Sequence, residues 1–578
     1  MSGPFQSEAE ATRFSRRSLV AALAAGASLA AFPAGVAAQI GPQVRSFPSL
    51  AALRAGGADP ASAEVALVES YWPGAGLGGG FFHYDAADVS SADDGGTVIV
   101  AGAARWKRVF SGALDVTWFG ATGGGEAERD ESPYFQAAMD AAFARRGGEV
   151  EVPASRGFYN FRNAVVCRDG VSLRGVGGKP RLRNTNRTLA QRVGLPGTIF
   201  LPGNFHPNFT QDRAAHAGVG ARYYPTGPIA DGAREVRLAR PGDAARFLAG
   251  DKVYVASRTS ISSGGFGVFD YAWLSTCAGA DTASGVVRFE DPVDHALAAG
   301  LICRLADNPG RGGLPLFFWR DGGLFNLDLG NAGLPLPYVG VVSDQACQRC
   351  RFDDLTVRGS ACGVINSQQD CHWARPTMIW SLSCLEMAQN SLRTRVEAPT
   401  MVFESAPGVE PQGLLMVHER SRWCAVDDAM MELGGVVVGP KDGQLMAIAG
   451  AAHCRILRPR ASGAGWNGPI VYLGGPSTPS FAVEGNVIAF ADIRLDRCLV
   501  WASLDGGGTA ATAHNGIEFC LFEGTPSDPA EAMIAKDNVG PNFLRGNVFD
   551  TGGFVARGPN TGLSSEGEDH RLAKTARD

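Results

Sequence analysis

From Cys350 onward the sequence repeats a short strand followed by a turn, and this repeat limits the fold more than any other feature. One apolar position of each unit aligns in a column with steps of 21, 23, 28 and 30 residues: Phe352, Trp373, Val396, Cys424 and Cys454. Steps of this length indicate a solenoid, in which each coil packs only against its neighbours. Later coils are expected to pass through Phe490, Phe519 and Leu544.

The side chains beyond each aligned position alternate between apolar and polar, as a strand requires. Met378 and Met401 stand five residues beyond their anchors, whereas Thr377 and Thr400 stand four residues beyond them. The apolar set is expected inside the solenoid and the polar set on its surface. Equivalent outward residues of successive coils would lie about 5 Å apart, because the coils pair like neighbouring parallel strands.

One amphipathic helix is predicted before these repeats, at residues 132–146. Ser132 is a good N-cap, Pro133 suits the first helical position, and Gly147 and Gly148 end the helix. Its apolar residues fall on one face: Phe135, Met139, Ala142 and Phe143. A helix with one apolar face suits the open end of a solenoid, so we expect it to be an N-terminal cap.

The segment from Phe119 to Tyr159 resembles the opening of pectate-lyase-like right-handed parallel β-helix proteins. This superfamily is related to polygalacturonases and includes phage tailspike-like and bacterial exported proteins, most of which process polysaccharides. The shared features are Phe119-Gly120-Ala121, the helix, Gly147-Gly148 and Pro153, whereas Gly123–Gly125 and Asp130–Ser132 depart from the pattern. The resemblance implies an all-β right-handed parallel β-helix with an N-terminal capping helix and a β-rich insertion.

These patterns divide the chain into six predicted parts. They are a signal peptide (1–38), an N-terminal module (39–112), the capping helix with the first coils (113–202), a β-rich insertion (203–345), the main β-helix (346–555) and a flexible polar tail (556–578). The module resembles one that precedes the same opening in tailspike-like proteins. Its matching segments are Gly78–Phe82, Asp93–Thr97 and Arg105–Arg108.

The N-terminus is predicted to be a twin-arginine export signal. Arg16 and Arg17 precede an apolar stretch, residues 19–31, that is too short to span a bilayer, and Val36-Ala37-Ala38 supplies a small-residue cleavage site. We therefore expect the twin-arginine machinery as a partner, no stable membrane span, and a periplasmic or secreted protein.

Composition argues against a nucleic-acid partner and against a zinc site. The net charge is −6, with no basic tail or stripe. Cys347 and Cys350 form one closely spaced pair, but no second pair follows it. Most of the twelve cysteines are expected to be small core residues stacked inside the coils, although which of them pair stays open.

Three outward carboxylates are the candidate catalytic residues: Asp428, Glu432 and Glu404. In the aligned coils Glu404 and Glu432 are lateral neighbours, and Asp428 lies beside Arg458. Crowded carboxylates suit glycoside hydrolysis, because repulsion raises the pKa of one carboxyl so that it can act as an acid while another stays ionised. The candidate substrate-binding residues are Arg458, Arg455, His453 and Trp423.

Asp427 and His418 lie near these candidates in the sequence but are not expected to be catalytic. Asp427 and Asp428 are similar to the paired aspartates of polygalacturonase-type hydrolases, but strand alternation turns Asp427 inward or into a turn, where a structural role is favoured. His418 is expected in the turn before Trp423, at the border of the groove.

Three functions remain open for this surface. A glycoside hydrolase cleaving an exopolysaccharide or pectin-like glycan is slightly favoured, and it needs no cofactor. A lyase or epimerase acting on a uronate glycan would hold Ca²⁺ on Glu404, Asp428 and Glu432, with Arg458, Arg455 or His453 as base or neutralising group. The third is a non-catalytic polysaccharide-binding protein. The sugar is not determined, and a homo-oligomer such as a trimer stays open.

Replacing both Arg16 and Arg17 with lysine should retain the precursor in the cytoplasm, because the twin-arginine receptor reads the guanidinium pair as an address. Immunoblots of cytoplasmic and periplasmic fractions measure this. Normal export of the double variant would contradict the assignment.

Overall fold

The computed structural model describes residues 44–58, 65–126, 129–185, 198–202, 222–263, 266–308, 317–331, 346–361, 364–404, 413–435, 438–439, 443–475, 477–478, 480–498, 501–526, 533–549, 554–558, 560–561, 563–566 and 569–570. The predicted signal peptide lies outside these residues. The chain divides into two compact units, the first formed by Met1–Thr122 and Pro133–Pro153, the second by Gly123–Ser132 and Ala154–Asp578.

The first unit contains a five-stranded sheet with the strand order β1-β2-β3-β5-β4. Its elements are β1 (Val44–Phe47), α3 (Leu50–Gly56), β2 (Val65–Ser70), β3 (Gly78–Tyr84), β4 (Val98–Ala101) and β5 (Ala104–Arg108), followed by β6 (Leu114–Asp115) and the 3-10 turn η2 (Val116–Phe119). Strands β1 and β2 are parallel, and the other neighbours are antiparallel. Phe82 and Trp106 are fully buried in its core.

A buried arginine ties this small sheet together. The Arg108 guanidinium donates to the carbonyls of Gly78, Gly79 and Gly96 at 2.9, 2.7 and 2.8 Å, and it lies 4.6 Å from the centroid of the Phe82 ring. The glycine and arginine segments of the predicted module are therefore parts of one hydrogen-bonded structure.

The predicted amphipathic helix is present as α4 (Ser132–Ala144), followed by β7 (Gly148–Pro153), which lies after Gly147 has ended the helix. Phe135 and Met139 are fully buried, as expected. Phe143 was expected on the same face, but half of its surface is exposed. The role of α4 as a cap of the solenoid stays a prediction.

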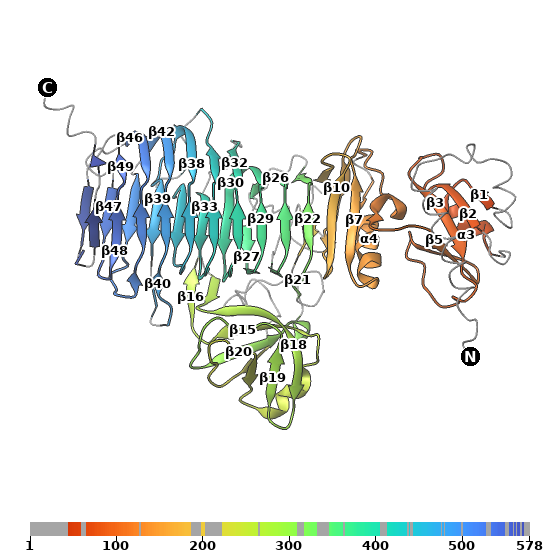
Figure 1. The fold of residues 1–578 in the computed structure, drawn as a ribbon, viewed down its shortest axis with the longest axis horizontal. Coiled ribbons are helices and arrows are strands. Elements are labelled where there is room, and N and C mark those ends of the chain that lie inside the picture. The colour runs from red at the N-terminus through yellow and green to blue at the C-terminus, as the bar shows by residue number, and fades with distance from the viewer. Residues whose placement is uncertain are drawn as a thin grey trace, which may run out of the picture. The chain divides into compact units, whose positions relative to one another are not determined.

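The second unit is a parallel β-helix with a β-rich insertion (Figure 1). One long sheet, here sheet I, has eleven strands in this unit, all paired in parallel with their neighbours: β10 (Val171–Val176), β22 (Gly323–Phe325), β25 (Arg351–Asp353), β29 (His372–Ala374), β31 (Arg395–Glu397), β34 (Ala425–Asp427), β37 (Arg455–Leu457), β41 (Val487–Ala489), β45 (Gly516–Glu518), β48 (Asn542–Arg545) and β51 (Leu563–Glu566).

Two further parallel sheets complete the coils and are continuous with each other through β30 (Thr377–Ala388). Sheet II contains β8 (Tyr159–Phe161), β11 (Arg181–Asn184), β23 (Asp328–Asn331), β26 (Thr356–Ala361), the first part of β30, β32 (Thr400–Phe403), β35 (Met430–Glu432), β38 (Arg460–Gly465), β42 (Asp492–Cys498), β46 (Leu521–Pro526), β49 (Val548–Phe549) and β52 (Asp569–His570). Sheet III contains β27 (Val364–Asn366), the second part of β30, β33 (Gly413–His418), β36 (Met446–Ala449), β39 (Val471–Gly474), β43 (Ala502–Asp505), β47 (Met533–Lys536) and β50 (Phe554–Arg557).

The insertion is a six-stranded antiparallel sheet below the β-helix in Figure 1, with the order β13-β20-β15-β18-β19-β14. Its strands are β13 (Tyr223–Pro225), β14 (Glu235–Arg237), β15 (Lys252–Ser257), β18 (Ala272–Asp281), β19 (Val286–Phe289) and β20 (Gly300–Arg304), with the hairpin β16 (Ser260–Ser263) and β17 (Phe266–Phe269). The β-helix resumes at β21 (Trp319–Arg320), before the predicted boundary at 346, because β22 pairs with both β10 and β25.

Short elements complete the second unit: β9 (Val165–Val166), β12 (Phe200–Leu201), β24 (Cys347–Gln348), β28 (Gln368–Gln369), β40 (Val483–Glu484), β44 (Thr512–Ala513) and the 3-10 turns η3 (Pro241–Arg246) and η4 (Leu305–Asp307).

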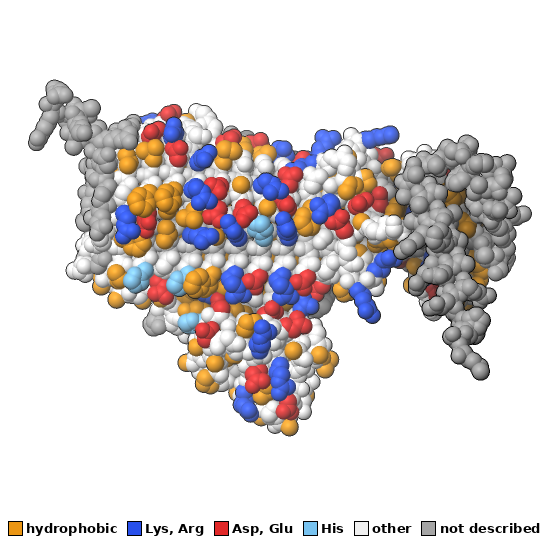
Figure 2. Space-filling model, viewed as in Figure 1, with side chains coloured by type: hydrophobic (Ala, Val, Ile, Leu, Met, Phe, Trp, Pro, Cys, Tyr) orange, Lys and Arg blue, Asp and Glu red, His pale blue; other side chains and the backbone are white. Residues whose placement is uncertain are grey.

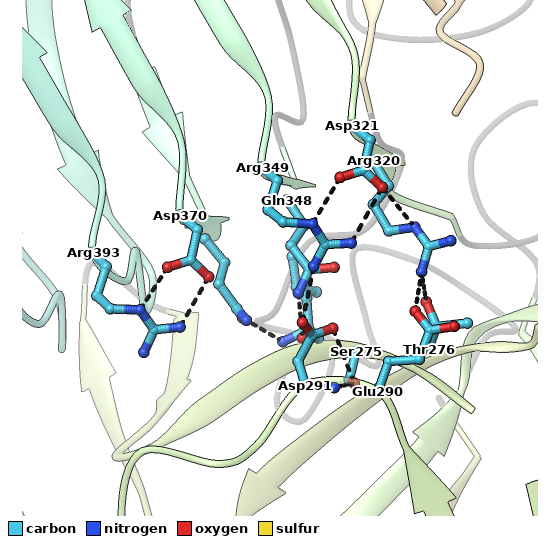
Figure 3. A network of polar contacts seen from close by, with 12 residues as sticks. Ser275, Thr276, Glu290, Asp291, Arg320, Asp321, Gln348, Arg349, Asp370 and Arg393 are labelled. Carbon is cyan, nitrogen blue, oxygen red and sulfur yellow. Dashed lines mark hydrogen bonds and ion pairs between the residues drawn. The ribbon is translucent and has the colours of Figure 1, made fainter. Parts of the chain in front are cut away.

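Ion pairs attach the insertion to the β-helix (Figure 3). Arg349 binds Asp291 of the insertion at 2.8 Å and Asp321 of the neighbouring coil at 2.7 Å, and Arg320 binds Glu290 at 2.6 Å. A deeper pair joins Asp270 to Arg420 at 3.1 Å. Because this pair is fully buried, it leaves the insertion little freedom to separate from the coils.

The aligned column of apolar residues is confirmed in its first part and wrong in its second. Phe352, Trp373 and Val396 are direct neighbours across the coils, but Val396 then pairs with Val426 and Val426 with Ile456, rather than with the cysteines two residues earlier. Ile488 and Ile517 continue this inward column, so the expected anchors Phe490 and Phe519 are also two residues late. Leu544 is correctly placed.

Four of the cysteines belong to a separate buried ladder, two residues before the apolar column: Cys350, Cys371, Thr394, Cys424, Cys454, Asn486, Asn515 and Asn542. In five of these turns the inward backbone N–H of a ladder residue donates to the ladder side chain of the next coil. Cys454 N–H donates to Asn486 at 2.9 Å, and Asn486 N–H donates to Asn515 at 3.2 Å. The eleven described cysteines are all buried, as predicted.

Replacing Asn515 with alanine should lower the free energy of unfolding by about 2–3 kcal/mol, because several buried hydrogen-bonding groups would lose their partner. Asn515 accepts from both nitrogens of Asn486 and donates to Val483 and Asn542. Urea unfolding midpoints measure the change. Asn467→Ala is the matched control, since Asn467 is exposed and should shift the midpoint little. Equal midpoints for the two variants would contradict the role of the ladder.

Candidate functional site

Two columns of residues in left-handed backbone conformation border sheet I. The trailing column follows each strand directly and has φ between 48° and 58° at Asn326, Asp354, Arg375, Ala398, Asp428, Arg458, Phe490 and Phe519. The leading column stands two residues before each strand and has φ between 48° and 57° at Asp321, Arg349, Asp370, Arg393, Trp423, His453 and His514. Each column turns the chain sharply, so its side chains project along one edge of the sheet.

Five predicted site residues come together on the two adjacent coils of β34 and β37. Trp423 and His453 are leading-column neighbours, Asp428 and Arg458 are trailing-column neighbours, and Arg455 lies between them on β37. This group is here called the sheet I patch. Figure 2 shows charged side chains gathered in rows along the β-helix, with exposed apolar side chains among them.

Asp428 and Arg458 form a two-point ion pair, as the aligned coils predicted. Arg458 Nε and Nη2 donate to the two Asp428 carboxylate oxygens at 2.7 and 2.9 Å, and both side chains are half exposed. The hydrogen bond from Arg458 lowers the pKa of Asp428. Asp428 is therefore held ionised, which suits a base, a nucleophile or a hydrogen-bond acceptor rather than an acid.

Asp427 is buried, but the predicted inward orientation is wrong. Val426 is the inward residue of β34, so Asp427 lies on the outer face of sheet I, where neighbouring arginines bury it. Its Oδ2 accepts from Arg395 at 2.9 Å, and Arg455 lies 3.9 Å away. Its Oδ1 has no hydrogen-bond partner among the described residues. Arg395 also binds Glu397 at 3.0 Å, which binds His372 at 3.2 Å. The outer face of sheet I thus carries a continuous ionic network beneath the patch.

Exposed aromatic rings lie at both edges of the patch. Trp423 is 53% exposed and stacks on His453 with ring centroids 4.0 Å apart. Phe490 and Phe519, which follow Arg458 in the trailing column, are 54% and 46% exposed and stack on each other at 5.4 Å. Sequence periodicity does not reveal this second pair, because it places both phenylalanines in the core.

The expected pairing of Glu404 with Glu432 is wrong. Glu432 on β35 is level with Val402 and Ser462, so Glu404 stands two residues out of register with it. In the part of the chain that the structure describes, the polar partner of Asp428 is Arg458, and neither glutamate has an ion pair with either residue. Both glutamates are exposed on or beyond sheet II.

The calcium set predicted for a lyase is not gathered into one group. Within the described ranges, no three His, Cys, Asp or Glu side chains are placed to hold a metal ion. None of the helices in these ranges has the length and apolarity to cross a membrane.

A second titratable pair lies on sheet III. His418 ends β33, rather than lying in the turn, and its Nε2 is 2.5 Å from Glu386 Oε1 on β30. Burial alone would lower the pKa of His418, but the charge of Glu386 and the hydrogen bond to it outweigh burial and raise this pKa to about 9. Glu386 was missed, although a lone acid in the apolar run of β30 is a signal for a partner.

A family model matches the N-terminal module of the chain. Residues 46–111 match the phage tail protein small four-stranded beta-sheet domain. A 116-residue stretch is 42% identical to the Mu-like prophage FluMu defective tail fiber protein of Haemophilus influenzae. This stretch is 19% of the chain and spans only 17% of that relative.

Solved structures similar to the chain are tailspikes and an adhesin. The tailspike of Acinetobacter baumannii phage AM24 covers 91% of the chain, and the chain covers 66% of it, at 13% identity and a TM-score of 0.41. A tailspike mutant of E. coli bacteriophage HK620 in complex with pentasaccharide covers 79%, with 65% of its own length matched, at 12% identity and 0.40. The Streptococcus pneumoniae surface protein and adhesin PfbA covers 79%, with 98% matched, at 10% identity and 0.40.

Replacing His418 with glutamine should destabilise the protein by about 1.5–3 kcal/mol at pH 6, the range for a hydrogen bond to a charged group. A histidine whose pKa rises on folding stabilises the folded state fully below its unfolded pKa of 6.5, and this contribution disappears as pH rises through about 9. Unfolding midpoints of wild type and variant should therefore converge by about pH 10.

Glu386→Gln provides the control for this prediction. If the ion pair is the cause, the double variant His418→Gln/Glu386→Gln should show no further loss at pH 6 beyond that of the more damaging single variant. A gap between wild type and His418→Gln that is equal at pH 6 and pH 10 would contradict the assignment.

Proposed function

We propose that the sheet I patch binds an extended polysaccharide. The observation that carries this proposal is the pair of exposed aromatic stacks, Trp423 with His453 and Phe490 with Phe519, beside the Asp428–Arg458 ion pair. Sugar rings have an apolar face that packs on aromatic rings and hydroxyls that bond to carboxylates and guanidinium groups. Clustered exposed rings of this kind mark a binding surface.

The spacing of the coils supports an elongated ligand. Asp428, Arg458, Phe490 and Phe519 occupy successive coils, so the row that they form is about 15 Å long. Backbone hydrogen bonds between coils hold every position, which reduces the ordering cost on binding. A rigid, nearly straight row of polar and aromatic groups favours a linear polymer over a small compact ligand.

The N-terminal module supports a location outside the cell. Its match to a phage tail domain favours a tail-associated, virion-borne protein. The twin-arginine signal and a periplasmic or secreted product remain predictions of the sequence. In either location, on a virion or exported from the cell, the sheet I patch would meet bacterial surface polysaccharides. The proposal holds for both locations.

Glycoside hydrolysis is the finer form of the proposal. It is favoured by Asp428, which Arg458 keeps ionised at the edge of the patch. In this form Asp428 is the base or nucleophile and Glu432 is the candidate acid. A lyase or epimerase would instead use Arg455 or His453 as the base or the neutralising group near the same carboxylate.

Trp423→Ala and Phe490→Ala should each weaken retention by the host's own exopolysaccharide about tenfold, or about 1.4 kcal/mol. Affinity electrophoresis in gels containing that polysaccharide measures the effect. Met430→Ala is the matched control, because Met430 is an exposed apolar residue on sheet II, and it should leave mobility unchanged. Equal retention of all three variants would place the binding surface elsewhere.

Asp428→Asn and Glu432→Gln should each lower turnover by on the order of 10²-fold with little change in stability. The matched control is Asp354→Asn. Asp354 is a trailing-column carboxylate three coils away from Asp428, and it is paired with Lys179. New reducing ends without unsaturation identify a hydrolase, unsaturated ends lost on EDTA treatment identify a Ca²⁺-dependent lyase, and no product identifies a binding protein.

A further inference from the structure

A pocket of about 360 Å³ lies where the insertion meets a turn of the β-helix. Arg258, Tyr271 and His295 line it from the insertion, and Ser480 lines it from the turn before β40. Its volume falls within the range of small-ligand sites. The sheet I patch contributes none of the residues that line it.

Buried charges next to the pocket hold two of its lining residues, Tyr271 and Ser480, in place. Asp270 and Arg420 form an ion pair at 3.1 Å with side chains 1% and 0% exposed. Asp270 also accepts hydrogen bonds from Thr478 and Ser480 of the turn, and Ser480 bonds to Thr259 at 3.0 Å. These bonds connect residues from both sides of the junction, so the pocket is formed before any ligand arrives.

One wall is aromatic. The His295 ring stacks on Tyr271 with centroids 3.9 Å apart and planes 6° apart. The Arg422 guanidinium lies 5.1 Å from the same tyrosine ring. Burial lowers the pKa of His295, and the positive charge of Arg422 adds to this. His295 is therefore neutral near pH 7, and it can both donate and accept a hydrogen bond.

Arg258 leaves the pocket with one uncompensated positive charge. Its guanidinium donates to the carbonyls of Thr226 and Gly300 at 3.2 and 3.4 Å, and it has no acidic partner among the described residues. The nearby acids are already committed, Asp270 to Arg420 and Asp294 to Arg422. A single guanidinium in a fixed position is matched by a carboxylate.

We propose that this pocket binds one carboxylate-bearing sugar unit, a hexuronate or a chemically similar acid. Arg258 receives the carboxylate, the hydroxyls of Thr259 and Ser480 bond to the sugar hydroxyls, and the aromatic wall contacts the sugar ring. The proposal rests on the polysaccharide-binding function and extends it, because it makes the glycan acidic and gives it a second point of attachment on the insertion.

Titration of the full-length protein with glucuronate, glucose, acetate and inorganic phosphate, followed by ligand-observed NMR, tests this. Glucuronate should bind, with glucose, acetate and phosphate each at least tenfold weaker. Arg258→Gln should weaken glucuronate binding about tenfold, and Arg258→Lys by less. Ser480→Ala, which leaves Arg258 in place, should also weaken it.

The matched control is Arg288→Gln, since Arg288 is an exposed arginine of the same insertion, paired with Glu235 at 3.4 Å. It should not change glucuronate binding. Circular dichroism confirms folding of every variant, because Arg258 also bonds to two backbone carbonyls. Glucuronate binding that is absent, that survives Arg258→Gln, or that acetate or phosphate equals would overturn the acidic-sugar site.

The two proposals fail in different ways. Trp423→Ala should leave glucuronate binding unchanged while it weakens polysaccharide retention. If wild type binds glucuronate through Arg258 but is not retained by any polysaccharide, the sheet I function fails and the pocket stands. If polysaccharide retention depends on Trp423 but glucuronate does not bind, the pocket fails and the sheet I function stands.

Discussion

The parallel hydrogen bonding between coils is the constraint on which the rest of this structure depends. On each side of sheet I, a left-handed residue donates its N–H to the next coil, as Asp428 does to Leu457 at 2.9 Å. A residue other than glycine costs roughly 1 kcal/mol in this conformation, so the bonds between coils must hold it there. The same bonds keep most sheet I strands three residues long, with a single inward side chain.

The stacking of coils places the turn residues of sheet I in exposed rows on the protein surface. Residues that would be scattered on a globular domain stand in rows, one per coil, about 4.8 Å apart. Near the insertion the leading column carries alternating acids and arginines, such as Asp370 and Arg393, which bind one another or the insertion. Farther along, the columns carry Trp423, His453 and Phe490, which face solvent. The change from ion pairs to exposed rings therefore distinguishes the coils that hold the insertion from the coils of the proposed binding surface.

Burial of polar groups decides where the coils are rigid. The ladder that begins with Cys350 and ends with asparagines accepts hydrogen bonds from inward backbone N–H groups in five of its turns. At the junction with the insertion, the buried charges of Asp270 and Arg420 pair with each other. An unpaired group at any of these places would carry the full cost of desolvation. Buried polar contacts therefore hold the backbone rigid under the sheet I patch and beside the junction pocket. Asp427, with one oxygen unpartnered among the described residues, is an exception on the outer face of sheet I.

The sequence by itself determined the features that depend on local periodicity. The coil spacing, the neighbours Trp373 and Val396, the helix α4 and the Asp428–Arg458 pair all follow from alternation and turn chemistry. The tertiary structure alone decided the rest. A slip of two residues keeps every side chain on its face, so periodicity could not choose between Cys424 and Val426, nor exclude the pairing of Glu404 with Glu432. The junction pocket depends on Asp270 and Arg420, which are 150 residues apart in the chain. Such contacts leave no periodic signal, because only the path of the insertion over the coils brings them together.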